Sequence, residues 1–162
     1  MPAKTSLIAL LAFAAPLTAQ TAAHPNFSGT WVLDASKTLV SGQMPAPATA
    51  TYLVVQRGDS ISADMTQGSE MGEMTVKKVY GVDGKEWQNS LDYQGTAMTL
   101  SSVLKWTGTL LSIHTNSNFQ GTPVEQNETW TLGEGGKTFS QRVTTMVNGE
   151  EWAATTLVFN KK

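Results

Sequence analysis

The stretch Ala97-Met98-Thr99-Leu100-Ser101-Ser102-Val103-Leu104-Lys105-Trp106-Thr107-Gly108 decides the fold. Apolar side chains recur at alternate positions, and one face of the segment carries Met98, Leu100, Leu104 and Trp106. Polar side chains, among them Thr99 and Lys105, fall on the other face, which is the pattern of a half-buried β-strand. The dipeptide Thr107-Gly108 then turns the chain into a second alternating segment, 109–116. The stretch therefore predicts a β-hairpin with one face on a core.

The same period of two recurs along most of the chain, and no helical period lasts longer than a turn or two. Asp83-Gly84 and Asn148-Gly149 provide the residues of type I′ hairpin turns, because both central positions of that turn need a positive φ. The alternating segments are 27–33, 51–56, 61–65, 74–80, 86–91, 97–106, 109–116, 124–132, 137–147 and 150–160. The chain is therefore expected to be all-β.

Short turns between successive strands predict an antiparallel meander. Such a sheet must close or leave exposed edges, so we expect a single up-and-down β-barrel of about nine or ten strands. A two-sheet sandwich is the alternative, and it would need longer crossing connections. The one long irregular stretch is 34–50, which contains Pro45 and Pro47.

The first 23 residues have the features of a signal peptide. Lys4 precedes an apolar run at 7–15, which is too short to span a bilayer, and Pro16 ends that run. Small residues would allow cleavage after Ala19 or Ala23. We therefore expect a signal peptide over 1–23, a barrel domain over 24–162, and a periplasmic or secreted protein. The alternative is an apolar N-terminal helix that the mature protein keeps.

Composition excludes several functional classes. The chain of 162 residues has the length of one domain, and its net charge of -2 argues against a nucleic-acid partner. Cysteine is absent and only two histidines are present, so we expect no metal site and no cofactor. The common motifs of enzymes are missing, which favours binding over catalysis. We expect no membrane span, and a monomer or weak dimer.

Several motifs resemble those of a known group of proteins. Phe27-Ser28-Gly29-Thr30-Trp31 carries the Gly-x-Trp that opens the lipocalins and the wider calycin group. Further matches, to secreted bacterial lipocalin-like proteins of unassigned function, are Asp83-Gly84-Lys85-Glu86, Leu104-Lys105-Trp106-x-Gly108 and Glu128-x-Trp130-x-Leu132. The resemblance implies a calycin-type barrel. It also implies that Trp31 closes one end beside a basic residue from a late strand, a role that falls on Arg142.

Fatty-acid-binding proteins share this barrel architecture and place a helical lid between their first two strands. The corresponding segment here, 34–50, contains two prolines and is a poor candidate for packed helices. The resemblance therefore implies the architecture but not the ligand.

Polar residues on the apolar faces mark the candidate site, because a buried polar group costs free energy unless it is hydrogen-bonded. A barrel of ten strands is too wide for its own side chains to fill, so inward polar groups usually meet water or a ligand. The predicted ligand-binding residues are Met98, Leu100, Ser102, Leu104, Gln126, Glu128, Trp130 and Gln141. The predicted partner is a small hydrophobic or amphipathic molecule.

Glu128 admits more than one interpretation. An inward carboxylate could orient a polar head group, or act as a general acid or base together with His114. Alternatively, Glu128 lies at the barrel mouth, solvated or paired with Arg142. The sequence leaves open which face of the His114 strand is inside. Three functions therefore stand: an exported carrier that binds or sequesters a small molecule, a ligand-free interaction module of the cell envelope, and, less favoured, a barrel enzyme.

Overall fold

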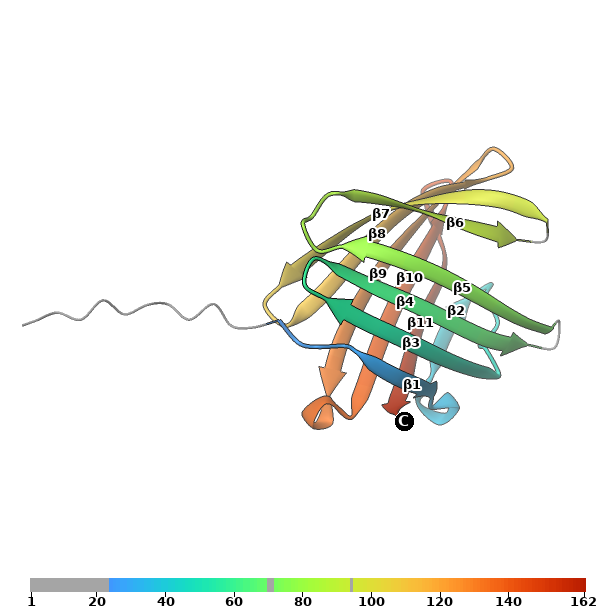
Figure 1. The fold of residues 1–162 in the computed structure, drawn as a ribbon. Coiled ribbons are helices and arrows are strands. Elements are labelled where there is room, and N and C mark those ends of the chain that lie inside the picture. Colours follow the sequence, from blue (N-terminus) through green and yellow to red (C-terminus); the bar gives the residue numbers. More distant parts are fainter. Residues whose placement is uncertain (1–23, 70–71, 94) are drawn as a thin grey trace, which may run out of the picture.

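The computed structural model describes residues 24–69, 72–93 and 95–162 (Figure 1). The predicted signal peptide, residues 1–23, lies outside the described residues. The strands are β1 (Gly29–Leu33), β2 (Leu39–Gly42), β3 (Thr49–Arg57), β4 (Ser60–Ser69), β5 (Gly72–Gly81), β6 (Glu86–Tyr93), β7 (Thr96–Thr107), β8 (Leu110–Phe119), β9 (Thr122–Gly133), β10 (Thr138–Val147) and β11 (Glu150–Lys161). Two 3₁₀ turns, η1 (Ala35–Lys37) and η2 (Glu134–Gly136), complete the described elements.

The strands form one antiparallel sheet in the order β5-β4-β3-β1-β11-β10-β9-β8-β7-β6 (Figure 1). Along this path, sequence neighbours pair from β3 to β5 and from β6 to β11, while β1 skips β2 to pair with β3 and also pairs with β11. The pairing of β1 with β11 rolls the meander into a nearly closed barrel. The predicted all-β, up-and-down barrel is confirmed, and the sandwich alternative is wrong.

The segment 34–50 is more ordered than the sequence indicates. After η1, β2 pairs antiparallel with the first half of β11, from Leu39 opposite Thr156 to Gly42 opposite Ala153. β1 pairs with the last part of β11, so both short strands lie along the same edge of one long strand. The expected irregular connection is therefore wrong for β2, whose four mostly exposed residues carry too little alternation to be recognised.

Of the two predicted type I′ hairpin turns, the structure contains the one at Asn148-Gly149 and not the one at Asp83-Gly84. Asn148 and Gly149 both have positive φ, at 53° and 82°, and they join β10 to β11 as predicted. Gly84 has a positive φ of 73°, but Asp83 does not. The expected hairpin at Asp83-Gly84 is also wrong, because β5 and β6 are the two ends of the sheet path rather than a hydrogen-bonded pair.

Side chains bridge this seam between β5 and β6. The backbone N–H of Val79 donates to Asn89 Oδ1 over 2.7 Å, and Asn89 Nδ2 donates to the Val79 carbonyl over 3.0 Å. The Asn89 amide thus replaces one step of a β-ladder. Next to it, the Trp87 indole lies against Gly81, where a Cβ would come within 1.9 Å of the indole nitrogen. The seam therefore needs a glycine at position 81.

Aromatic side chains fill one end of the barrel. The ring of Phe139 contacts five other rings at centroid separations of 5.0 to 5.7 Å: Phe27, Trp31, Tyr52, Trp130 and Phe159. Five of these six side chains are 0% exposed and Tyr52 is 2% exposed. We call this group the aromatic end. His24 covers its outside by stacking on Trp106 with 4.4 Å between centroids.

Trp31 closes this end, as the resemblance implies, but its basic neighbour differs from the expected one. The Lys161 Nζ lies 5.1 Å from the centre of the Trp31 ring, a cation–π contact from the last strand. The role assigned to Arg142 is therefore wrong, because Arg142 is exposed on the outside of β10. Gly29, at φ +148°, makes the contact possible, since a Cβ there would lie 2.9 Å from Lys161 Cε.

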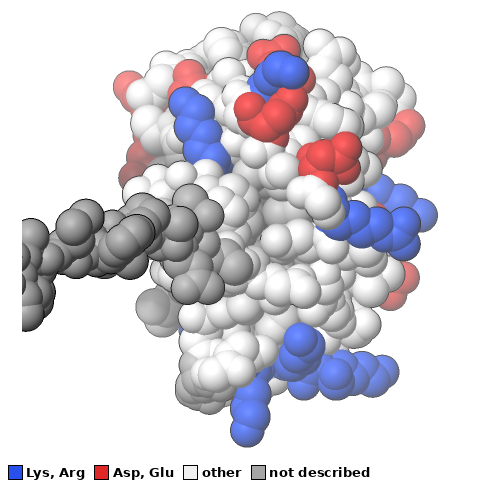
Figure 2. Space-filling model, turned by 60° about the vertical axis from the view of Figure 1, so that its left-hand side comes forward, with Lys and Arg blue, Asp and Glu red and all other residues white. Residues whose placement is uncertain are grey.

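Charged side chains lie mainly toward the two ends of the face seen in Figure 2. Basic groups gather at the lower end of that view, both signs mix at the upper end, and the surface between them is mostly uncharged. This face therefore carries no continuous band of one sign. In the part of the chain that the structure describes, none of the helices has the length and apolar character needed to cross a membrane.

Replacing Asn89 with Ala should loosen the seam. Loss of two partly solvated hydrogen bonds should lower the free energy of unfolding by about 1–2 kcal/mol. The Val79 amide should also exchange its hydrogen faster, because its acceptor is gone, and hydrogen exchange measured by NMR would show this. Gln88→Ala, on the exposed outer face of the same strand, is the control. Unchanged exchange at Val79 would contradict the bridging role of Asn89.

Candidate ligand-binding site

Strand alternation places all eight predicted site residues on the inner wall of the barrel. Leu100, Ser102, Leu104, Glu128, Trp130 and Gln141 are 0–4% exposed, while Met98 and Gln126 are half-buried. They come from β7, β9 and β10, and the register aligns them across β8. The structure thus confirms their shared face, and their role in binding stays a prediction.

Glu128 is the centre of a polar group inside the barrel. Its Oε1 accepts hydrogen bonds from Trp130 Nε1 and, over 2.6 Å, from Gln141 Nε2. The residue is 3% exposed. The alternative that placed Glu128 at the barrel mouth, solvated or paired with Arg142, is therefore wrong.

Lys78 completes this group and was not among the predicted site residues. Its Nζ lies 3.9 Å from Glu128 Oε2, and only 13% of its side chain is exposed. Lys78 alternates inward on β5 with Val76 and Tyr80, whereas Lys77 points outward and is exposed. The sequence signal for Lys78 is its spacing of two residues from Val76 and from Tyr80, which places it on the same face of the strand as these apolar side chains. We call Lys78, Glu128 and Gln141, with the nearby hydroxyl of Tyr80, the interior polar group.

Two tyrosines face this group. Burial, followed by the negative charge of Glu128, raises the pKa of both Tyr52 and Tyr80 well above the usual 10.0. The polar side chain of Gln141 beside Tyr52 opposes the shift of the Tyr52 pKa. The edge-on contact of Tyr80 with Trp130, at 6.5 Å between centroids, holds its ring beside the same indole that binds Glu128.

The interior polar group is not fully satisfied within the protein. Among the described residues, the Tyr80 hydroxyl and Gln141 Oε1 have no hydrogen-bond partner, although each atom is buried. Buried polar atoms in folded proteins are nearly always paired with protein, water or ligand. These two atoms therefore mark a position where a further polar group would be stabilised.

Beyond this group, toward the turns at 119–122 and 147–150, the inner wall changes character. Small or hydroxyl side chains replace the aromatic ones: Ala50, Ser102, Thr115, Thr145, Ala153 and Thr155. Ser102 and Thr115 satisfy each other through a 2.8 Å hydrogen bond. The inward side chains of Met74, Met98 and Gln126 are half-buried rather than buried, so the inner wall is partly exposed to solvent at this end. We call it the open end.

His114 lies on the other side of the wall from Glu128. Its neighbours Ile113 and Thr115 are buried inside, while its ring pairs outside with Asn127 over 2.9 Å. The inside face of this strand is therefore the one that carries Ile113 and Thr115, and the proposed acid–base pair of Glu128 and His114 is wrong. His114 instead lines a shallow outer hollow of about 270 Å³ with Val103, Lys105 and Ser112.

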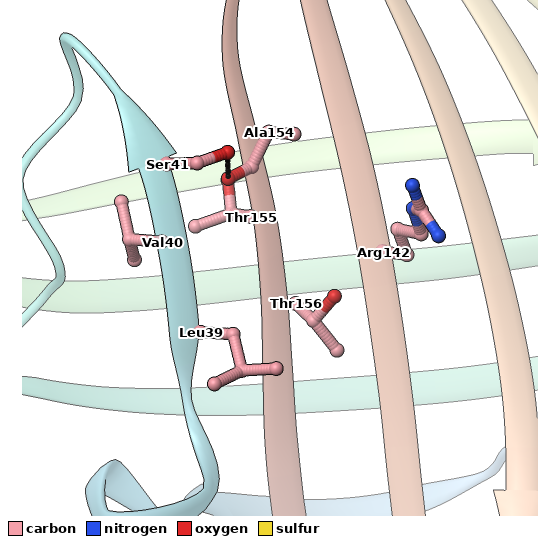
Figure 3. Close-up of a pocket in the computed structure, with 7 residues that line it drawn as sticks. All are labelled: Leu39, Val40, Ser41, Arg142, Ala154, Thr155 and Thr156. Carbon is pink, nitrogen blue, oxygen red and sulfur yellow. Dashed lines mark hydrogen bonds between the residues drawn. The ribbon is translucent and has the colours of Figure 1, made fainter.

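A second outer hollow, of about 260 Å³, lies where β2 joins β11. Figure 3 shows Leu39, Thr156 and Arg142 in a row across β2, β11 and β10, with the Ser41 hydroxyl bonded to the Ala154 carbonyl. Leu39 is 70% exposed. This hollow is open to solvent and contains none of the predicted site residues.

The described residues include no group of three or more His, Asp or Glu side chains that could hold a metal ion. The interior polar group has one carboxylate and one ammonium, which is the composition of a hydrogen-bonding site rather than a cation site.

No family model matches the chain, and a comparison with curated proteins finds no match. Solved structures do match. A secretary abundant heat soluble (SAHS) protein from Ramazzottius varieornatus has a TM-score of 0.56 at 9% identity, over 84% of this chain and 95% of that one. The zebrafish ileal bile acid-binding protein complexed with cholic acid has a TM-score of 0.53 at 18% identity, over 84% of this chain and 98% of that one.

This chain has the fold of a calycin-type β-barrel. At these identities the likeness concerns the fold alone, and it agrees with the architecture that the Gly-x-Trp motif implied. The bacterial lipocalin-like grouping suggested by the motifs stays a prediction.

The two buried tyrosines should make the protein sensitive to alkali. Their folded-state pKa is raised, so the folded protein holds their protons when the unfolded chain has lost them. Their contribution to stability is complete below pH 10 and is lost above it, by up to about 1.4 kcal/mol per pH unit for each tyrosine. Unfolding in urea between pH 8 and 11.5 would measure this slope.

The double variant Tyr52→Phe, Tyr80→Phe is the control for this prediction, because it removes both titrating hydroxyls and keeps the rings. It should flatten the decline above pH 10. A decline of the same steepness in this variant would contradict the assignment to Tyr52 and Tyr80.

Proposed function

We propose that this protein is an exported barrel that carries or sequesters a small hydrophobic or amphipathic molecule in its interior. One observation carries the proposal: a polar group of Lys78, Glu128 and Gln141 lies inside the barrel, between an aromatic end and an open end. A protein that only needed a stable core would bury apolar side chains there, because a buried ion pair contributes little to stability.

The rest of the inner wall suits the apolar part of such a molecule. Leu100, Leu104, Ile113 and Leu157 are buried on this wall and surround the polar group. Ligand sites are mostly apolar with a few placed polar groups, and that is the composition here. A similarly folded barrel, the zebrafish protein, is complexed with cholic acid, an amphipathic molecule, which supports the class of ligand by analogy.

The proposed route into the interior is the open end. Half-buried Met74, Met98 and Gln126 line it, and methionine adapts to ligands of different shape. The aromatic end offers no comparable route, since its Phe27, Trp31 and Phe139 side chains are 0% exposed.

Export and a periplasmic or secreted location belong to the proposal and rest on residues 1–23, with their lysine, apolar run and small residues before the cleavage positions. Release from the membrane would leave the barrel free to exchange its ligand. A monomer or weak dimer suits that role.

The interaction-module alternative has less support. The exposed large apolar side chains of the protein lie on three separate parts of the wall: Val32 and Leu53 on β1 and β3, Val79 and Trp87 at the seam, and Leu39 and Trp152 near β2. Interfaces usually need one contiguous patch.

Native mass spectrometry of the protein, purified without organic solvent from the cells that make it, tests the proposal directly. We expect extra mass of a few hundred daltons that solvent extraction removes. The same preparation also shows where the N-terminus lies, which tests cleavage after Ala19 or Ala23. A bare mass under several growth conditions would favour the interaction module.

Filling the interior should abolish binding. Ala153 points inward at 2% exposure, while its neighbour Ala154 points outward. We expect Ala153→Phe to weaken binding of the neutral dye N-phenyl-1-naphthylamine at least about tenfold, because a buried aromatic ring would occupy the ligand's space. Ala154→Phe is the matched control, and circular dichroism would verify that both variants fold. Equal dye binding by both variants would mean that the dye sits outside the barrel.

A further inference from the structure

The charges of the interior polar group already balance each other. Lys78 Nζ lies 3.9 Å from Glu128 Oε2, and the carboxylate also accepts hydrogen bonds from Trp130 and Gln141. A ligand carboxylate placed here would bring a second negative charge beside Glu128. A ligand ammonium would likewise face Lys78. In a buried site either arrangement leaves one charge without a partner, which is costly.

Two neutral polar atoms near Glu128 have no hydrogen-bond partner among the described residues. The Tyr80 hydroxyl can donate a hydrogen bond, and Gln141 Oε1 can accept one. Their residues are only 1% and 3% exposed. Gln141 is held toward Glu128 by its own N–H, so its oxygen is directed away from that carboxylate. Tyr80 comes from the opposite wall, beside Lys78 on β5.

We propose that the ligand bears an uncharged head group that both donates and accepts hydrogen bonds, a hydroxyl or a primary amide, and that Tyr80 and Gln141 recognise it. This inference rests on the proposed function of the barrel. The head group accepts from the Tyr80 hydroxyl and donates to Gln141 Oε1. Its apolar tail extends toward the open end, along Leu100 and Met98.

A water molecule is the competing occupant, since it also donates and accepts. A ligand hydroxyl replaces water at this position only if the barrel accommodates the ligand's apolar tail and its head group at the same time. The comparison of ligands that share a tail and differ in the head group therefore separates the two cases.

The test uses five ligands with the same ten-carbon chain: 1-decanol, decanamide, decanoate, decylammonium and decane. Each displaces N-phenyl-1-naphthylamine from the wild-type protein at pH 7, and the displacement gives its affinity. We expect the alcohol and the amide to bind about tenfold or more tightly than the acid, the amine and the alkane. A factor of ten corresponds to one well-placed buried hydrogen bond.

Variants locate the head group. Tyr80→Phe and Gln141→Leu should each weaken decanol about tenfold and leave decane unchanged, because only the hydrogen bond is lost. Gln88→Leu is the matched control: it removes an exposed amide from the outer face of β6, away from the interior. Decanol affinity should stay within about twofold of wild type in this variant.

The outcomes separate the two proposals. Tightest binding of decanoate would overturn the uncharged head group and make Lys78 an anion partner. Equal binding of all five ligands would also overturn it, with water occupying the polar group, while the carrier function would stand. If neither the dye nor any ligand binds, the carrier function itself fails.

Discussion

Phe139 packs its ring against five other aromatic rings at centroid separations of 5.0 to 5.7 Å, and this cluster determines how the barrel uses its interior. A ten-stranded barrel encloses more space than ordinary side chains fill. By gathering its largest buried rings at one end, the chain obtains a close-packed core there. The rest of the inner wall is then free to carry alanine, serine, threonine and methionine. The close-packed aromatic core and the wall of smaller and polar side chains thus occupy different lengths of the same strands.

The interior polar group lies at the boundary between these two regions. Trp130 belongs to both, since its ring packs on Phe139 while its N–H donates to Glu128. The carboxylate is therefore positioned by the rigid core rather than by a loop. Lys78 reaches it from β5, several strands away around the sheet, so the charge pair also links the two halves of the barrel across the interior.

Period-two alternation was sufficient to predict the described strands other than β2, and the inward face of β7, β9 and β10, because each of these strands buries every second residue regardless of its partners. It could not predict Lys78 as the partner of Glu128, since that contact joins residues fifty positions apart across the barrel. The same limit explains the error over Arg142: alternation places it outside, and only the pairing of β1 with β11 brings Lys161 to Trp31. Asp83-Gly84 carries hairpin residues, yet Trp87 and Asn89 occupy the seam where backbone pairing would be.

The placement of the polar group also bears on the energetics of binding. Removing Lys78 and Glu128 from water is costly, but folding incurs that cost when the barrel closes around them. A ligand would therefore meet polar atoms that are already dehydrated and held in place, and its own ordering would be the main remaining penalty. Under those conditions a single hydrogen bond would discriminate between head groups, because a mismatched head group would leave a buried polar atom without a partner. If the barrel binds a ligand as proposed, its selectivity would depend on the few polar atoms left unpaired by the fold, while the apolar wall would supply affinity without distinguishing one tail from another.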